Sequence, residues 1–247
     1  LSRVFELNGA TLRLEGVKLA NGISTNGAVY ARGATMTMID GEIINSSAAQ
    51  FGGAITVDSS NVTLINSKII NSQSGNYGGA AYIGGGGNMT ITAGSLVVNS
   101  SAKQGGALFI AESGGNLKVT HNSGVINSTC ARYGGALYMS AYGTFLLSDN
   151  SSIIGSISNT EGGAASTGGA FVIANGSSIV DSYSLIFGGA LDIFGGSLTI
   201  SNASSINNSR ANFGGAMRVT GASVMIAGGS SVDGSFCRTS GGGVYLV

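Results

Sequence analysis

The side chains that could carry out acid–base chemistry are few and scattered. Carbohydrate-cleaving enzymes need clustered carboxylates, with Lys or Arg nearby, to transfer protons or to hold calcium. The chain has 11 Asp and Glu among 247 residues and a single histidine, His121, which precedes Asn122 in a turn-like stretch. We predict no catalytic residue, metal site or cofactor, because an enzyme would require acidic residues distant in sequence to meet on one face.

Two glycine-rich stretches resemble phosphate-binding loops in composition only. Residues 84–87 are four consecutive glycines, and residues 160–173 read TEGGAASTGGAFVI. Neither has the Lys-Ser/Thr pair that completes a nucleotide-binding loop. The 11 basic residues are balanced by 11 acidic ones, which argues against a nucleic-acid partner because phosphate binding needs a basic surface.

Asparagine offers another candidate chemistry, the attachment of N-linked glycans. Nine Asn-x-Ser/Thr sequons occur, although a chain rich in Ser and Asn also forms such triplets by chance. Four belong to a structural row described below, where an inward-facing side chain would be inaccessible: Asn45, Asn99, Asn127 and Asn207. The other five are our glycosylation candidates if the source is eukaryotic: Asn61, Asn88, Asn150, Asn175 and Asn202.

A recurring Gly-Gly-Ala triplet, which we call the marker, divides the chain into periods whose strands must position these residues. The predicted repeat corners begin at Gly52, Gly78, Gly105, Gly134, Gly162, Gly188, Gly214 and Gly241, with a related sequence, NGAV, at Asn26. Neighbouring corners are 26 to 29 residues apart. The second Gly-Gly-Ala of residues 160–173 starts at Gly168 and would give spacings of 34 and 20, so we assign the corner to Gly162.

Each period contains short runs of alternating apolar residues, such as Val62 and Leu64, or Leu198 and Ile200. Alternation of this length is typical of half-buried strands, and no window keeps the spacing of a helix. Such strands bury their apolar faces only when successive periods stack. We predict an all-β, right-handed parallel β-helix with about nine coils and three short strands per coil. With strands about 4.8 Å apart, the rod would be about 43 Å long.

Two rows of equivalent side chains are expected to stack along this rod. Asn and Asp recur about seven residues before each corner and would form a hydrogen-bonded ladder: Asn45, Asn71, Asn99, Asn127, Asp181, Asn207 and Asp233. Aromatic residues directly precede five corners and would stack on one another: Phe51, Tyr77, Tyr133, Phe187 and Phe213.

The two cysteines test the predicted stacking. Cys130 and Cys237 each lie four residues before a corner, at Gly134 and Gly241, which places them at equivalent positions four coils apart. Four coils span about 19 Å, far beyond the ~7 Å between Cα atoms that a disulfide tolerates. We therefore expect each cysteine to be either a buried apolar residue or bonded to a neighbouring subunit.

The repeated GGA[ILM] resembles the repeat of chlamydial polymorphic outer membrane proteins and related surface proteins of bacteria and protists. It occurs as Gly52-Gly-Ala-Ile55, Gly105-Gly-Ala-Leu108 and Gly214-Gly-Ala-Met217, and the resemblance extends from Asn26 to Val247. It implies a right-handed β-helix at the cell surface that serves in adhesion or as an extracellular structural element.

We predict a single domain over residues 1–247, a segment of a longer chain since it starts with Leu1. Its expected function is an extracellular, N-glycosylated structural module of a fibre, filament or cell-surface appendage. It would associate end to end with copies of itself or with flanking repeats of the same chain. No apolar run approaches the ~18 residues of a membrane span.

Other functions remain open. A cell-surface adhesin that binds host or carbohydrate ligands would be favoured if the tyrosines outside the predicted aromatic row formed one patch: Tyr30, Tyr82, Tyr138 and Tyr142. A carbohydrate-active enzyme or an ice-binding protein comes third, because the Thr-x-Thr pairs that ice binding requires do not recur in every period.

Overall fold

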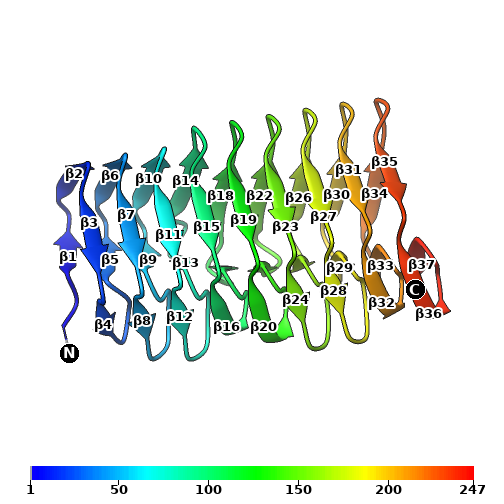
Figure 1. Ribbon diagram of the computed structural model, residues 1–247, viewed down its shortest axis with the longest axis horizontal. Helices are drawn as coiled ribbons and strands as arrows, with labels where there is room; N and C mark the ends of the chain where they lie inside the picture. Colours follow the sequence, from blue (N-terminus) through cyan, green and yellow to red (C-terminus); the bar gives the residue numbers. More distant parts are fainter. Residues whose placement is uncertain (1) are drawn as a thin grey trace.

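The computed structural model describes residues 2–247 and is a rod of parallel strands with the two termini at opposite ends (Figure 1). About nine coils stack along the rod, and each contributes one strand to each of four sheets. The predicted parallel β-helix is confirmed. Residues 2–247 contain no helix that could cross a membrane.

The four sheets, named A to D in chain order, hold these strands. Sheet A consists of β1 (Phe5–Asn8), β5 (Val29–Arg32), β9 (Ile55–Asp58), β13 (Ala81–Gly84), β17 (Leu108–Ile110), β21 (Leu137–Met139), β25 (Ala165–Thr167), β29 (Leu191–Ile193), β33 (Met217–Val219) and β37 (Val244–Leu246). Sheet B consists of β2 (Thr11–Glu15), β6 (Thr35–Ile39), β10 (Asn61–Ile65), β14 (Asn88–Thr92), β18 (Gly115–Val119), β22 (Gly143–Leu147), β26 (Ala170–Ile173), β30 (Ser197–Ile200) and β34 (Ser223–Ile226). Sheet C consists of β3 (Lys18–Ala20), β7 (Glu42–Ile44), β11 (Lys68–Ile70), β15 (Leu96–Val98), β19 (Gly124–Ile126), β23 (Ser152–Ile154), β27 (Ser178–Val180), β31 (Ser205–Asn207) and β35 (Ser231–Asp233). Sheet D consists of β4 (Ile23–Ser24), β8 (Ser47–Ala48), β12 (Gln73–Ser74), β16 (Ser101–Gln104), β20 (Thr129–Tyr133), β24 (Ile157–Ser158), β28 (Tyr183–Ser184), β32 (Arg210–Phe213) and β36 (Phe236–Ser240).

The sequence prediction of three strands per coil is wrong, because the structure has four. The strand that was not predicted belongs to sheet D. Many sheet D strands have only two residues, as in β8 and β12, and their inward positions hold small side chains such as Ala48 and Ser74. Because strands of this kind show no apolar alternation, the sequence pattern makes them look like a polar turn.

The core is built from columns of equivalent residues, one from each coil. Sheet B alternates buried and outward positions, so that Leu64 of β10 lies in register with Met38 of β6 and Ile91 of β14. All three of these side chains are fully buried. Since every coil adds the same inward positions, the apolar column runs the length of the rod, and stacking buries what a single coil could not.

The Gly-Gly pairs lie where the backbone leaves no room for a side chain: the first glycine is crowded by its own coil and the second by the next coil. A Cβ on Gly162 would lie 2.0 Å from the carbonyl oxygen of Ala165, and Gly162 has a φ of +61°. A Cβ on Gly163 would lie 2.0 Å from the carbonyl oxygen of Gly189, its counterpart in the next coil. Gly168 lacks a positive φ and faces the Phe194 ring instead, so the corner falls at Gly162.

Candidate functional site

The corner between sheets C and D carries the predicted Asn ladder on its outer side. Five residues there adopt left-handed φ values of 50–54°: Asn45, Asn71, Asn99, Asn127 and Asp181. The Asn71 side-chain amide donates to Asn45 Oδ1, and that of Asn99 to Asn71 Oδ1, each over 3.3 Å. Asn tolerates the left-handed region better than most residues, so one residue type satisfies the turn and joins the coils.

Two predicted ladder members are wrong. Asn207 ends β31 and pairs with Asp233 of β35, whereas the left-handed corner positions belong to Asn208 and Gly234. The reason is that the number of residues between the corner of sheets C and D and the following Gly-Gly-Ala triplet varies. Gly214 is six residues after Asn208, and Gly52 is seven residues after Asn45.

The ladder side chains are exposed, which contradicts the inward orientation considered for its sequons. The serines that follow them point inward and are almost completely buried. Five consecutive coils bury a serine hydroxyl that has no hydrogen-bond partner in the structure: Ser72, Ser100, Ser128, Ser156 and Ser182. The inner wall of this corner is therefore lined by hydroxyl groups that form no hydrogen bond within residues 2–247.

Two further polar ladders contain most of the glycosylation candidates. At the start of sheet B, the Asn88 amide donates to Asn61 Oδ1 over 2.8 Å. At the corner between sheets B and C, the Asn175 amide donates to Asp149 Oδ1 over 2.9 Å, and the Asn202 amide donates to Asn175 Oδ1 over 3.0 Å. This bonding lowers the pKa of Asp149. The Nδ2 atoms to which a glycan would attach are thus already used as donors in three of the five candidates.

Aromatic side chains form a strip over sheet A, which we call the aromatic strip: Phe51, Tyr77, Tyr82, Phe109, Tyr133, Tyr138 and Phe194. The Tyr82 and Phe109 ring centroids are 5.5 Å apart, with planes 7° from parallel. Those of Phe109 and Tyr138 are 5.0 Å apart, at 17°. Pairs of this geometry stabilise one another beyond the area they bury.

The predicted row of five aromatics is interrupted. Phe51 stacks with Tyr77 at 6.1 Å, and Phe187 packs against Phe213 at 5.3 Å. Gln104 occupies the equivalent position between Tyr77 and Tyr133, and Glu161 that between Tyr133 and Phe187. Tyr133 instead lies beside Tyr138 on sheet A, with centroids 6.2 Å apart.

Beyond the aromatic strip, two acids from different coils meet at one arginine. Arg218 Nε donates to Asp192 Oδ1 over 2.5 Å, and its Nη2 lies 3.3 Å from Glu161 Oε2. The guanidinium also lies 3.9 Å from the centroid of Phe187. Burial, and secondarily the Asp192 carboxylate, raise the pKa of Glu161. Asp192 is fully buried and held by Arg218, so it is not presented to a substrate.

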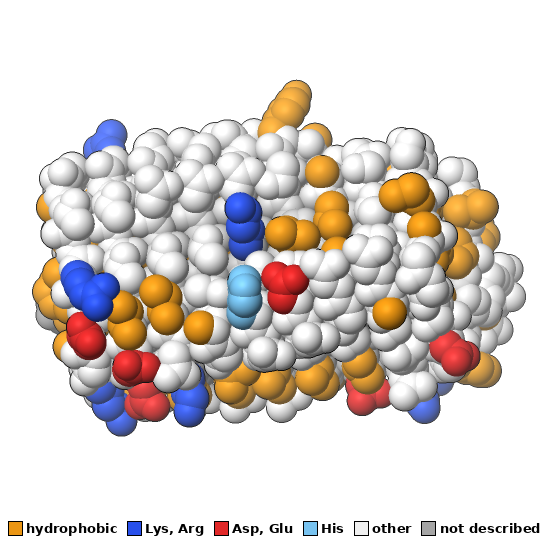
Figure 2. Space-filling model, turned by 90° about the horizontal axis from the view of Figure 1, so that it is seen from above, with side chains coloured by type: hydrophobic (Ala, Val, Ile, Leu, Met, Phe, Trp, Pro, Cys, Tyr) orange, Lys and Arg blue, Asp and Glu red, His pale blue; other side chains and the backbone are white. Residues whose placement is uncertain are grey.

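The single histidine lies midway along the rod, on a face with few charges (Figure 2). Its Nδ1 is 3.3 Å from Thr92 Oγ1 and 3.9 Å from Asp149 Oδ2. His121 has a left-handed φ of 56°, as expected for a turn residue. Residues 2–247 contain no group of three or more His, Cys, Asp or Glu side chains that could hold a metal ion.

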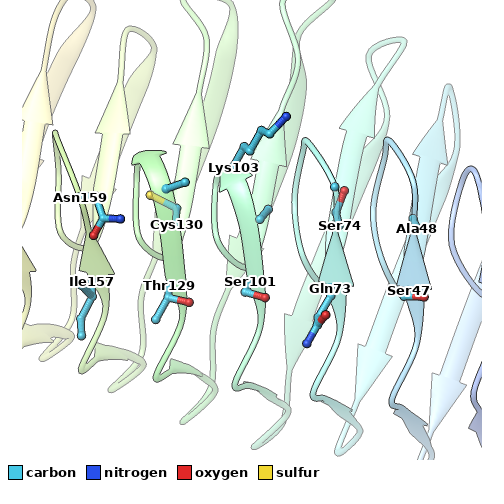
Figure 3. A pocket seen from close by; sticks show the side chains of 13 residues that line it. Ser47, Ala48, Gln73, Ser74, Ser101, Lys103, Thr129, Cys130, Ile157 and Asn159 are labelled. Atoms are coloured by element: carbon cyan, nitrogen blue, oxygen red, sulfur yellow. The ribbon is translucent and has the colours of Figure 1, made fainter.

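Sheet D forms a shallow groove of about 530 Å³ that extends over five successive coils, with outward side chains of mixed size along it: Ser47, Gln73, Ser101, Thr129 and Ile157 (Figure 3). Cys130 faces this region and is buried, which raises the pKa of its thiol to about 11. Cys130 and Cys237 are both free and belong to the inward column of sheet D, four coils apart. Lys103 donates to Asn76 Oδ1 over 3.2 Å.

Threonines align on the outer face of sheet B over three coils only. Thr37, Thr63 and Thr90 lie in register, and Lys118 interrupts the column at the next coil. A flat ice-binding face would need the column to continue.

Sequence reasoning missed Phe109 and Phe194, and it did not anticipate that Asp192 and Arg218 meet. A usable signal was present, because Tyr82, Phe109 and Tyr138 each occur four residues after the first glycine of a marker. Comparison with protein-family models, curated proteins and solved structures yields no match.

Proposed function

We propose that this chain is a rigid structural module of an extracellular fibre or cell-surface appendage. The observation that supports this most strongly is the pairing of each coil with the next in all four sheets, with glycine and apolar positions aligned along the rod. Solenoids of this kind hold their ends at a fixed separation, because each coil packs only on its neighbours and repeats the same cross-section.

The last coil supports continuation of the stack. Val224 and Ile226 of β34 occupy the columns of Leu198 and Ile200, which are buried in β30. Val224 and Ile226 are 38% and 42% exposed, and Leu246 of β37 is 72% exposed. Further coils, from the same chain or from the end of another copy, would bury these side chains.

The polar surface fits an extracellular setting. Exposed amide ladders line the outside and include most of the nine sequons, and only 9% of residues are charged. The repeat resembles that of bacterial and protist surface proteins, which is the further reason for proposing this location. N-linked glycans on exposed ladder positions would belong to the same surface.

Electron microscopy of the purified 247-residue chain tests the proposal. We expect rods joined end to end, with an axial repeat near the ~43 Å length of nine coils. The double variant Val224→Lys and Ile226→Lys should abolish the joining, because it places charges on the surface that would be buried. Tyr142→Lys, on an exposed turn at the side of the rod, is the matched control. Dispersed wild-type monomers at all concentrations would contradict end-to-end assembly.

An adhesin is the second candidate, and one observation favours it. Tyr82 and Tyr138 lie in the same aromatic strip, as a ligand-binding patch requires. Tyr142 lies on a turn outside the strip and is 79% exposed.

A further inference from the structure

We propose that the outer face of sheet A binds a neutral carbohydrate chain in a hollow between β5 and β13. The hollow has a volume of about 290 Å³ and opens between Tyr30 and Tyr82. Thr56 of β9 lies between them in strand register. Because threonine is much smaller than tyrosine, the row of large side chains is interrupted there, and Phe51 closes one side. This site goes beyond the structural role and does not depend on it.

The hollow contains a polar group without a partner. Thr56 is only 3% exposed, and its hydroxyl makes no hydrogen bond within residues 2–247. Leaving a buried hydroxyl unpaired is costly, and such groups in native proteins call for an explanation. Because this hydroxyl lies at the floor of the hollow and is almost inaccessible, a bound hydroxyl group would pair with it after a small shift of the side chains that cover it.

The walls supply hydrogen-bonding groups of both kinds. The Tyr30 hydroxyl donates to Asp58 Oδ2 over 3.4 Å, and Asn26 adds an amide to the lining. Burial and the nearby Asp58 carboxylate raise the pKa of Tyr82, so its hydroxyl stays protonated and can donate. Carboxylate oxygens accept, amides do both, and phenols do both, which matches a ligand covered with hydroxyl groups.

A second hollow of about 460 Å³ continues along the rod. It shares Tyr82 and Ser113 with the first and adds Gln104 and Glu112 to the polar lining. Neither hollow is lined by a Lys or Arg side chain. The two together can therefore hold more than one sugar. Asp58 is paired with Arg32, whose Nε lies 3.7 Å from Asp58 Oδ2, so it is the Glu112 carboxylate that disfavours an anionic glycan.

The spacing along the face favours a glycan over a peptide. Successive rings from Tyr82 through Phe109 to Tyr138 have centroids 5.5 and 5.0 Å apart, close to the length of one sugar in an extended chain. Because Tyr82, Phe109 and Tyr138 stack on one another, a sugar would contact their outer edges while its hydroxyls bond to the polar lining. A proline-rich peptide would instead repeat its ridge about every 9 Å, or three residues of a polyproline II helix.

Titration with defined oligosaccharides tests this site. The probes are cellotetraose, chitotetraose, mannotetraose and maltotetraose, followed by tyrosine fluorescence, since the chain contains no tryptophan, and by saturation-transfer NMR. We expect saturable binding of at least one probe. Tyr82→Ala, which removes a wall, and Thr56→Val, which removes the hydroxyl at nearly constant volume, should each weaken it about tenfold or more. Tyr142→Ala should bind like the wild type.

Three results would overturn the proposal. The first is the absence of saturable binding by all four probes. The second is unchanged affinity in both Tyr82→Ala and Thr56→Val when circular dichroism shows that the variants are folded. The third is a decaproline peptide that binds in a Tyr82-dependent manner while the sugars do not, which would make the face a peptide groove. The assembly of the rods is measured separately, so failure of either proposal leaves the other standing.

Discussion

Gly163→Ala tests the register of the coils at the point where the sequence is ambiguous. The new Cβ would lie 2.0 Å from the carbonyl oxygen of Gly189 and 2.6 Å from that of Tyr183. Both are backbone atoms of the next coil, so relief requires that coil to move by more than about 1 Å against its neighbours. The hydrogen bonds at risk include Gly163 N–H to Gly188 O, at 3.1 Å, and Gly135 N–H to Gly162 O, at 3.0 Å.

Overpacking a dense interior costs about 1–3 kcal/mol, and two weakened hydrogen bonds add about 1 kcal/mol each. We therefore expect a loss of about 3–5 kcal/mol in the free energy of unfolding, measured by urea denaturation followed by far-ultraviolet circular dichroism. Gly242→Ala is the matched control, because Gly242 holds the same place in the last marker and a Cβ there meets nothing within 4 Å. Equal stability of the two variants would refute the proposed register.

Three other predictions concern single side chains. Because the pKa of Glu161 is raised in the folded protein, folding favours the protonated side chain. This contribution to the free energy of unfolding is fully present below the ordinary glutamate pKa of about 4.3 and is lost as the pH rises through the pKa in the folded protein. Glu161→Gln should therefore flatten the decline of the melting temperature above that pH, and an unchanged profile would count against the burial argument. Iodoacetamide should label Cys237 in the native protein but Cys130 only after unfolding, because the Cys130 thiol has a pKa of about 11 and reacts only as the thiolate; mass spectrometry of the peptides decides this. If the chain is secreted from eukaryotic cells, glycan occupancy should be highest at the sequons whose Nδ2 atoms donate no hydrogen bond within residues 2–247: Asn45, Asn61, Asn127 and Asn150. Glycopeptide mapping that shows preferential occupancy at the other five sequons would contradict it.

The fold was predictable because glycine marks each coil for a steric reason. A Cβ at Gly163, or at its equivalents in every coil but the last, meets backbone of the next coil, so the Gly-Gly-Ala triplet recurs with the period of the solenoid and reveals it. The alternation of apolar and polar residues around Val62 and Leu64 arises because only one face of sheet B is buried. Sheet D left no such signal, since its inward residues are small and its strands are short.

The side-chain rows were predictable only as far as the coils have equal segment lengths. Counting back from the marker finds Asn45 and Asn71 correctly, but it selects Asn207 where Asn208 holds the corner. The hollow at Thr56 could not be predicted from residue types, because it depends on a small side chain lying between two large ones that are 26 residues away on either side. The meeting of Glu161, Asp192 and Arg218 similarly arises from stacking of three coils.

We propose that the coils form a continuous stack that extends beyond a single module. Cryo-electron microscopy of assembled material tests it most directly, because coil spacing is visible along the axis. We expect filaments in which strands about 4.8 Å apart continue without interruption across the junction that contains Val224 and Leu246. Isolated rods, or filaments joined side by side with these residues still exposed, would contradict it.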